Sequence, residues 1–273
     1  MPEFSVLLSV YKNEKYEYFE AALNSILNQT MAPSEIVLIR DGEVPKPLQV
    51  SIDRFLENSI VPVKYIPFEK NGGLGNALRV GIEACTYSLV ARMDTDDISA
   101  SDRFERQLKA FSENPDVDVI GGQVSEFREN PKILSGNRIV PCTHSQIVQY
   151  ARYRSPFNHP TVMYKRDSVL RAGNYVEIKY LEDYYLWCRM ILNNCRFMNL
   201  PETLVYMRVN SDTYQRRGGY RYYQSFKKLE RFKRQKRLTD RKTYILNIAM
   251  RFIQSVLLPP QVRGLLYKII HQA

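Results

Sequence analysis

The sequence predicts an α/β fold in which a mostly parallel sheet is flanked by helices. Short apolar runs of strand length recur through the first 120 residues, and segments with helical periodicity separate them. Strands that are apolar on both faces are typical of parallel sheets covered by helices on each side. The expected strands are residues 4–10, 35–39, 63–66, 88–93 and 117–120.

The helices between these strands follow from the spacing of apolar residues. Phe19, Leu23, Ile26 and Leu27 are spaced i, i+4, i+7 and i+8, so they share one face of a helix. Similar patterns predict helices at 52–56, 75–85 and 104–111. From about residue 121 the pattern becomes β-rich, with strands expected at 124–127, 133–140, 161–164 and 204–208, and a helix at 182–192.

The net charge of +10 comes from the C-terminal segment. Residues 220–273 hold 13 Lys and Arg against Glu230 and Asp240, whereas the remaining residues sum to −1. With 44% hydrophobic and 25% charged residues, the composition excludes a disordered or fibrous protein. The four cysteines lack CxxC spacing, and the chain has neither a signal-peptide pattern nor a long apolar span. We therefore expect a cytoplasmic, nearly neutral globule with a basic extension.

An acidic cluster directly follows the strand predicted at 88–93. Asp94, Asp96 and Asp97 fall within four positions, and ligands of open parallel sheets lie beyond the carboxyl ends of strands. Clustered carboxylates repel one another unless a cation offsets their charge, and hard oxygen ligands suit Mg²⁺ or Mn²⁺. A solvated acidic turn in which Asp97 or Ser99 caps the next helix is the alternative.

Two further segments are candidates for binding or catalysis. Residues 70–76, which include Asn71 and Gly73, form a glycine-rich turn that opens a helix, where exposed amides favour anions. They do not match a dinucleotide fingerprint, which would follow the first strand. Glu182 and Asp183 begin a helix that contains Trp187, and a carboxylate there can serve as a general base or simply favour the helix dipole.

Taken together, these motifs resemble the family 2 glycosyltransferases with the GT-A fold. The motifs are Ser9–Glu14 after the first strand, Asp41-Gly42 after the second, the Asn71–Gly73 turn, the acidic cluster, and Glu182-Asp183 before Leu186-Trp187, in that order. The chain looks especially similar to the bacterial branch that builds O-antigen, capsule and exopolysaccharide units. The resemblance implies a GT-A domain over 1–219, with a nucleotide-binding half at about 1–120 and an acceptor half at about 121–219.

The resemblance also implies a role for each matching residue. Tyr11 and Asp41 match positions that hold the base of a nucleotide-sugar, and Asn71 and Gly73 belong to the same site. Asp94 and Asp96 match the DxD pair that meets ribose, cation and diphosphate, while Asp97 matches an acid that contacts the donor sugar. The other implied residues are Asp183 as catalytic base, its neighbour Glu182, His159 as a candidate metal ligand, and Arg216 and Arg217 in a loop over the diphosphate.

The implied activity is inverting hexosyl transfer, metal-dependent on Mn²⁺ or Mg²⁺. The expected donor is UDP-glucose or UDP-galactose, and the expected acceptor is a sugar linked to undecaprenyl diphosphate. Two alternatives remain. A sugar nucleotidyltransferase would share the metal and nucleotide but needs an early glycine loop, and a nucleic-acid-binding protein would need exposed aromatic residues in the basic extension. We expect no nucleic-acid partner, because that alternative leaves the acidic motifs unexplained.

The basic extension, residues 220–273, is expected to form an amphipathic helix that ends before Pro259-Pro260. Ile245, Ile248, Phe252 and Val256 would share its apolar side. Such a helix can lie on an anionic membrane, which predicts a peripheral protein on the inner face of the cell membrane. The alternative is packing on the catalytic domain or on a second subunit, and hence a homodimer.

Overall fold

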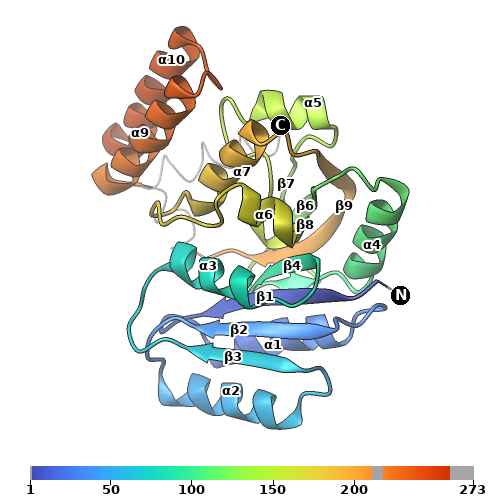
Figure 1. Cartoon of the computed structure of the whole chain (residues 1–273). Helices are drawn as coiled ribbons and strands as arrows, with labels where there is room; N and C mark the ends of the chain where they lie inside the picture. The colour runs from blue at the N-terminus through green and yellow to red at the C-terminus, as the bar shows by residue number, and fades with distance from the viewer. Residues whose placement is uncertain (1, 211–217, 259–273) are drawn as a thin grey trace.

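A single mixed sheet crosses the molecule in the computed structural model, which describes residues 2–210 and 218–258 (Figure 1). Its strands lie in the order β3-β2-β1-β4-β8-β6-β9-β5, and β7 pairs with β6. Their bounds are β1 Phe4–Val10, β2 Glu35–Arg40, β3 Val63–Pro67, β4 Leu89–Asp94, β5 Ile98–Ser99, β6 Val119–Phe127, β7 Leu134–Arg138, β8 Met163–Lys165 and β9 Phe197–Arg208.

The sheet is parallel from β3 to β4, where the sequence predicts parallel strands. β6 and β9 are also parallel, whereas β8, β5 and β7 pair antiparallel with their neighbours. The predicted α/β fold class is therefore confirmed. The sheet continues through the boundary expected at residue 120, because β6 spans it, so the two expected halves share one sheet.

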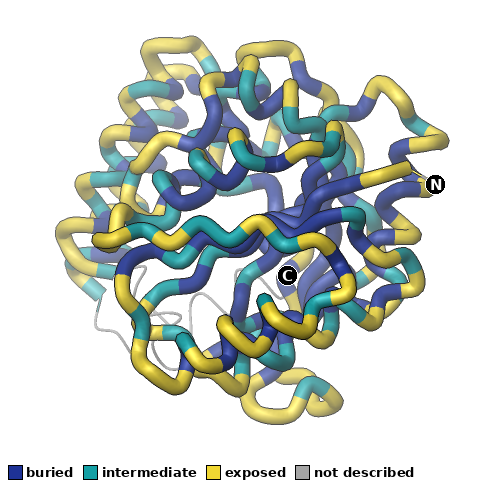
Figure 2. The backbone as a smooth tube through the Cα atoms, turned by 60° about the horizontal axis from the view of Figure 1, so that its bottom comes forward, coloured by how far each residue is buried: buried dark blue, intermediate teal, exposed yellow. Residues whose placement is uncertain are grey.

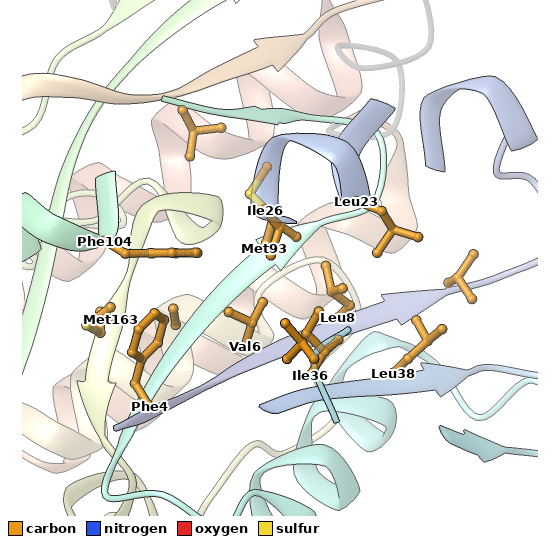
Figure 3. Close-up of a cluster of buried hydrophobic side chains, with 14 of the residues drawn as sticks. Phe4, Val6, Leu8, Leu23, Ile26, Ile36, Leu38, Met93, Phe104 and Met163 are labelled. Atoms are coloured by element: carbon orange, nitrogen blue, oxygen red, sulfur yellow. The ribbon is translucent and has the colours of Figure 1, made fainter. Parts of the chain in front are cut away.

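Helices cover both faces of the sheet, as expected from strands that are apolar on both sides. α1 (Tyr16–Leu27), α2 (Lys46–Asn58) and α4 (Arg103–Glu113) pack on one face, with Phe4, Val6 and Leu8 of β1 beneath them (Figure 3). α3 (Leu74–Ala84), α6 (Arg166–Arg171) and α7 (Glu182–Leu192) cover the other face, against Leu7 and Val37. In Figure 2 the central strands form a buried interior inside partly exposed helices and loops.

The expected strands at 117–120 and 124–127 are one continuous strand, β6, and this boundary was wrong. Gly121 and Gly122 resemble a turn signal, yet they lie in the strand because they pair with Asn199 and Leu200 of β9, and neighbouring side chains leave no room there for a Cβ. A Cβ on Gly122 would lie 2.5 Å from Leu204. β9 begins at Phe197, seven residues before its prediction, since Pro201 interrupts its apolar pattern.

Short elements escaped the sequence analysis because they carry too few residues to show a period. They are α5 (His144–Tyr150), α6, the two-residue strand β5 and the 3₁₀ turn His159–Thr161. All four cysteines are free, as expected from their spacing.

The basic extension forms a helical hairpin instead of one continuous helix. α9 (Tyr220–Gln235) and α10 (Arg241–Phe252) lie side by side, and a π-helical turn, Ile253–Leu257, continues α10 (Figure 1). Arg237 has a φ of +59° in the connection, and Asp240 accepts a hydrogen bond from the Thr243 backbone N–H at 2.7 Å. A new N-cap therefore restarts the helix. No helix among residues 2–210 and 218–258 is long and apolar enough to cross a membrane.

Candidate active site

The carboxyl ends of β1, β2 and β4 meet at one edge of the sheet. Ser9 of β1 lies opposite Asp94 at the end of β4, and Val10 lies opposite Arg40 at the end of β2. The strand order reverses between β1 and β4, and open α/β sheets bind ligands at such a reversal. Tyr11 and Asp41 follow directly on β1 and β2, so the fold brings two predicted nucleotide-binding residues to the edge that carries the acidic cluster.

Three carboxylates converge in the turn between β4 and β5. One oxygen each from Asp94, Asp96 and Asp97 lies within 4.8 Å of the others, the only such group of potential metal ligands in the described part of the chain. Burial, together with the charges of Asp94 and Glu14, raises the pKa of Asp96 to about 7. Desolvation, together with the charges of Asp96 and Asp94, raises the pKa of buried Asp97 well above its ordinary value.

Arg92 holds Asp94 from inside the sheet. Its guanidinium is almost fully buried, donates to both Asp94 oxygens, and lies 2.7 Å from Oδ2 through Nη1. Beside it, fully buried Arg103 donates to the Arg92 carbonyl oxygen at 2.8 Å. Arg92 was not among the predicted site residues, although a cation inside an otherwise apolar strand is a signal visible in the sequence. Arg92 forms hydrogen bonds with Asp94 only, and although its charge also favours ionised Asp96 and Asp97, burial and mutual repulsion still raise the pKa of those two carboxyl groups.

Asp97 supports the assignment of a cation site. Its Oδ1 accepts the Arg208 backbone N–H at 2.8 Å, while its buried Oδ2 has no hydrogen-bond partner. A buried carboxylate oxygen without a partner is costly unless a ligand completes its environment. Three oxygen donors with repelling charges fit a hard divalent cation such as Mg²⁺ or Mn²⁺.

Arg208 and Glu14 complete the surroundings of the acidic turn. Arg208 ends β9, donates from Nε to the Asp96 carbonyl at 3.2 Å, and stacks its guanidinium over the Tyr18 ring at 3.8 Å. Glu14 accepts a hydrogen bond from the Thr95 hydroxyl at 2.9 Å. These contacts join residues distant in sequence and hold the turn between β1 and β9.

Asp41 organises the predicted glycine-rich turn. Its carboxylate accepts the Gly72 backbone N–H at 2.6 Å, the Gly73 N–H at 3.1 Å and the Asn71 side-chain amide at 2.8 Å. Gly73 has a φ of +86°, which disfavours any residue with a Cβ. The structure therefore brings three predicted nucleotide-site residues into direct contact. The amide of Gly75, by contrast, donates to Glu177 at 2.9 Å, so a side chain already occupies that part of the helix N-terminus.

The two acids that begin α7 differ in environment. Glu182 is buried, accepts the Tyr180 backbone N–H at 3.2 Å, and burial raises its pKa to about 8. Asp183 is half-buried, and the Ser155 hydroxyl donates to it at 3.3 Å. A protonated carboxyl cannot accept a proton, so near neutral pH Asp183 is the better candidate for a general base.

Replacing Glu182 by Gln should change the pH dependence of stability. The folded protein keeps a proton on Glu182 that the unfolded chain releases above its ordinary pKa of 4.5, so this group lowers the free energy of unfolding as pH rises toward about 8. Relative to the wild type, Glu182→Gln should gain stability over that range in urea titrations. Glu57→Gln, at an exposed site on α2, is the control, and parallel profiles for Glu182→Gln and the wild type would contradict the prediction.

His159 does not lie among the three carboxylates, so the structure does not support it as a metal ligand. Its Nε2 is 2.8 Å from the Tyr175 hydroxyl, and its ring packs against Trp187. Burial and the nearby Arg92 charge lower its pKa well below the ordinary value, which keeps the ring neutral. Burial raises the pKa of Tyr175, and the charges of Asp183 and Asp94 act in the same direction, so this aromatic group lies near both parts of the site.

Two further expectations concern the C-terminal third of the chain. Arg216 and Arg217, predicted over the diphosphate, lie outside the described residues. The nucleic-acid alternative needs exposed aromatic residues in the extension, but Tyr222 and Phe226 are buried against α7. The residues expected to stack on bases are Tyr220, Tyr222, Tyr223 and Phe226, so two of these four are unavailable, which weighs against that alternative.

Comparison with known proteins shows the family to which the chain belongs. Residues 5–173 match the model of glycosyl transferase family 2, and the chain belongs to that family. This agrees with the resemblance found in the sequence and removes the support for a nucleotidyltransferase.

Two relatives align with most of the chain. The chain is 41% identical over 230 residues to the amylovoran biosynthesis glycosyltransferase AmsE of Erwinia amylovora, covering 84% of this chain and 85% of the relative. It is 38% identical over 267 residues to the UDP-Gal:alpha-D-GlcNAc-diphosphoundecaprenol beta-1,3-galactosyltransferase of Escherichia coli, covering 98% of this chain and 96% of the relative.

Solved structures share the fold at low sequence identity. The mannosyltransferase PcManGT of Pyrobaculum calidifontis, solved with GDP-Man and Mn²⁺, superimposes with a TM-score of 0.66 at 15% identity, covering 100% of this chain and 76% of that one. S. aureus TarS gives a TM-score of 0.66 at 18% identity, covering 93% of this chain and 44% of that one. The protein is thus a family 2 glycosyltransferase with a GT-A-like fold.

Proposed function

We propose that this glycosyltransferase moves a hexose from a UDP-sugar to a sugar linked to undecaprenyl diphosphate, with inversion at the anomeric carbon. The observation that carries the proposal is the acidic group beside the ends of β1 and β2, in a chain that aligns over almost its whole length with a relative of that specificity. The relative's name favours UDP-galactose over UDP-glucose as donor.

The donor would lie along the edge formed by β2, β1 and β4. Tyr11 and the Asp41-organised turn at Asn71 and Gly73 are proposed to bind the nucleoside. Asp94 and Asp96 are the proposed cation ligands, and Asp97, which lies beside them, is the proposed contact to the donor sugar. A Mn²⁺ or Mg²⁺ ion held there supplies positive charge to the departing diphosphate. Arg92 keeps Asp94 oriented through two hydrogen bonds.

Asp183 is the proposed base for the acceptor hydroxyl. It lies in the first turn of α7, where the helix dipole favours a negative charge, and Ser155 fixes its orientation. As the acceptor oxygen attacks the anomeric carbon, Asp183 takes the hydroxyl proton and the bond to the diphosphate breaks. One displacement inverts the configuration. Glu182 remains protonated beside it and supports the Tyr180 backbone.

A transfer assay tests the proposal directly. The protein is incubated with UDP-galactose or UDP-glucose, Mn²⁺, and a synthetic acceptor in which N-acetylglucosamine is linked through diphosphate to a lipid. We expect a metal-dependent increase in acceptor mass by one hexose, with β-linkage from an α-linked donor seen by NMR. Transfer to the acceptor from neither UDP-sugar, or retention of configuration, would contradict the proposal, and product formation that survives chelation would contradict its metal assignment.

A further inference from the structure

Helix α10 exposes its apolar side and buries its polar side. Thr243 and Asn247 are its buried residues, and Ser255 is buried in the π-helical turn that follows. The exposed residues include a set of large apolar side chains, each 48–61% exposed: Ile245, Leu246, Met250, Ile253 and Leu257, here called the α10 apolar face. This is the reverse of an ordinary surface helix.

A buried polar cluster fixes α10 in this orientation. Asn247 donates to Glu230 of α9 at 3.1 Å and to the Arg152 carbonyl at 2.8 Å. Lys233 donates to Glu230 at 2.6 Å, to the same carbonyl at 2.9 Å and to the Tyr184 hydroxyl at 2.8 Å. Rotating α10 to bury its apolar face would break both hydrogen bonds of Asn247, one of them to the buried Glu230 carboxylate, and losing buried hydrogen bonds is costly.

The composition of the face differs from the sequence-based expectation. Ile245 and Phe252 are exposed as expected, but Ile248 and Val256 are half-buried, whereas Leu246, Met250 and Ile253 lie outward. The difference arises because α9 and its polar cluster decide which side of α10 faces inward. A cluster of exposed large apolar residues on a monomer surface usually marks a contact with another molecule or a membrane.

The charge next to the face identifies the kind of partner. Four exposed cations precede the face in the chain, here called the basic connection: Lys236 and Arg237 between α9 and α10, and Arg241 and Lys242 in the first turn of α10. The two acids of this region pair with other cations: Glu230 with Lys233 in the interior, and Asp240 with Arg152 at the surface. The hairpin therefore offers apolar side chains beside four exposed cations, none of which forms an ion pair within the described residues.

We propose that the α10 apolar face inserts into the surface of an anionic membrane, with the basic connection on the lipid headgroups. Apolar side chains beside Lys and Arg are the pattern by which helices lie in the plane of such a surface. The inference rests on the proposed function, in which the acceptor is linked to a membrane lipid. Its test measures binding and not transfer, so the two proposals can fail separately.

Two charge-matched variants of the full chain test this assignment. Ile245→Glu/Met250→Glu alters the α10 apolar face. Val50→Glu/Ile60→Glu makes the same change in charge at exposed apolar residues in and just after α2, at the opposite end of the molecule (Figure 1). Co-sedimentation is measured with phosphatidylcholine vesicles, with and without phosphatidylglycerol, at low and high salt.

We expect wild-type protein and the α2 variant to bind the anionic vesicles, more weakly at high salt because screening reduces headgroup attraction. The α10 variant should bind about tenfold or more weakly, since two apolar side chains no longer enter the lipid. Equal binding by all three proteins, or none by the wild type, would overturn the proposal. A fall in Tm or a change in native mass in the α10 variant alone would also overturn it, and would assign the face to residues 259–273 or to a second copy.

Discussion

Asp183→Asn should bind the UDP-sugar as the wild type does and lose turnover by about 10²-fold or more, the scale expected when a general base is removed. The amide keeps the shape of the side chain and can still pair with Ser155, but it cannot take a proton from the acceptor hydroxyl. The measurement is kcat with a lipid-diphosphate-linked acceptor, together with donor affinity by calorimetry.

Two further variants locate the effect. Asp167→Asn, at an exposed site on α6, should leave kcat unchanged. Glu182→Gln should stay close to wild-type turnover near neutral pH, because burial already keeps Glu182 largely protonated there. If Asp183→Asn turns over at the wild-type rate while Glu182→Gln does not, then Glu182 and not Asp183 is the general base.

Asp96→Asn should abolish transfer and remove the dependence of UDP binding on Mn²⁺. Asp96 is one of three carboxylates gathered within 4.8 Å, and burial, together with repulsion from Asp94 and Glu14, raises its pKa to about 7; a bound cation would offset both effects. Without metal, the variant should therefore be as stable as the wild type or more stable. With Mn²⁺ and UDP, the wild type should gain in Tm and the variant should not.

The matched control for this change is Asp116→Asn, an exposed aspartate outside the site. It should keep transfer activity and the full gain in Tm. Wild-type UDP affinity with unchanged Mn²⁺ dependence in Asp96→Asn would rule out Asp96 as a cation ligand.

Much of the fold could be predicted because its first half is locally consistent. β1 and β2 are apolar at nearly every position, and α1 repeats its apolar residues with helical spacing, so each segment favours one structure before tertiary contacts form. The elements that were missed or displaced depend on distant residues. Gly122 lies in a strand through its pairing with Leu200 of β9, 78 residues further along the chain.

The candidate site also contains residues that the sequence predicts and residues that it does not. The carboxylates of Asp94, Asp96 and Asp97 were predictable, since a buried strand that runs into three acids places them at the binding edge of a parallel sheet. The partners of these acids were not. Arg92 pairs with Asp94 two residues away, whereas Arg208 reaches Asp97 from 111 residues further along the chain. His159 matched a family position, but its hydrogen bond goes to Tyr175.

By itself, the sequence determined the alternation of strands and helices, the place of the acidic turn and the concentration of charge near the C-terminus, because each depends on residues close together in the chain. The resemblance implied Asp183 as the base, and the tertiary structure adds a physical reason to prefer it, since burial raises the pKa of Glu182. Only the tertiary structure decided which side of α10 faces outward. Periodicity shows that a helix has an apolar side. The hydrogen bonds of Asn247 to Glu230 of α9 and to the Arg152 carbonyl determine that the apolar side of α10 faces outward.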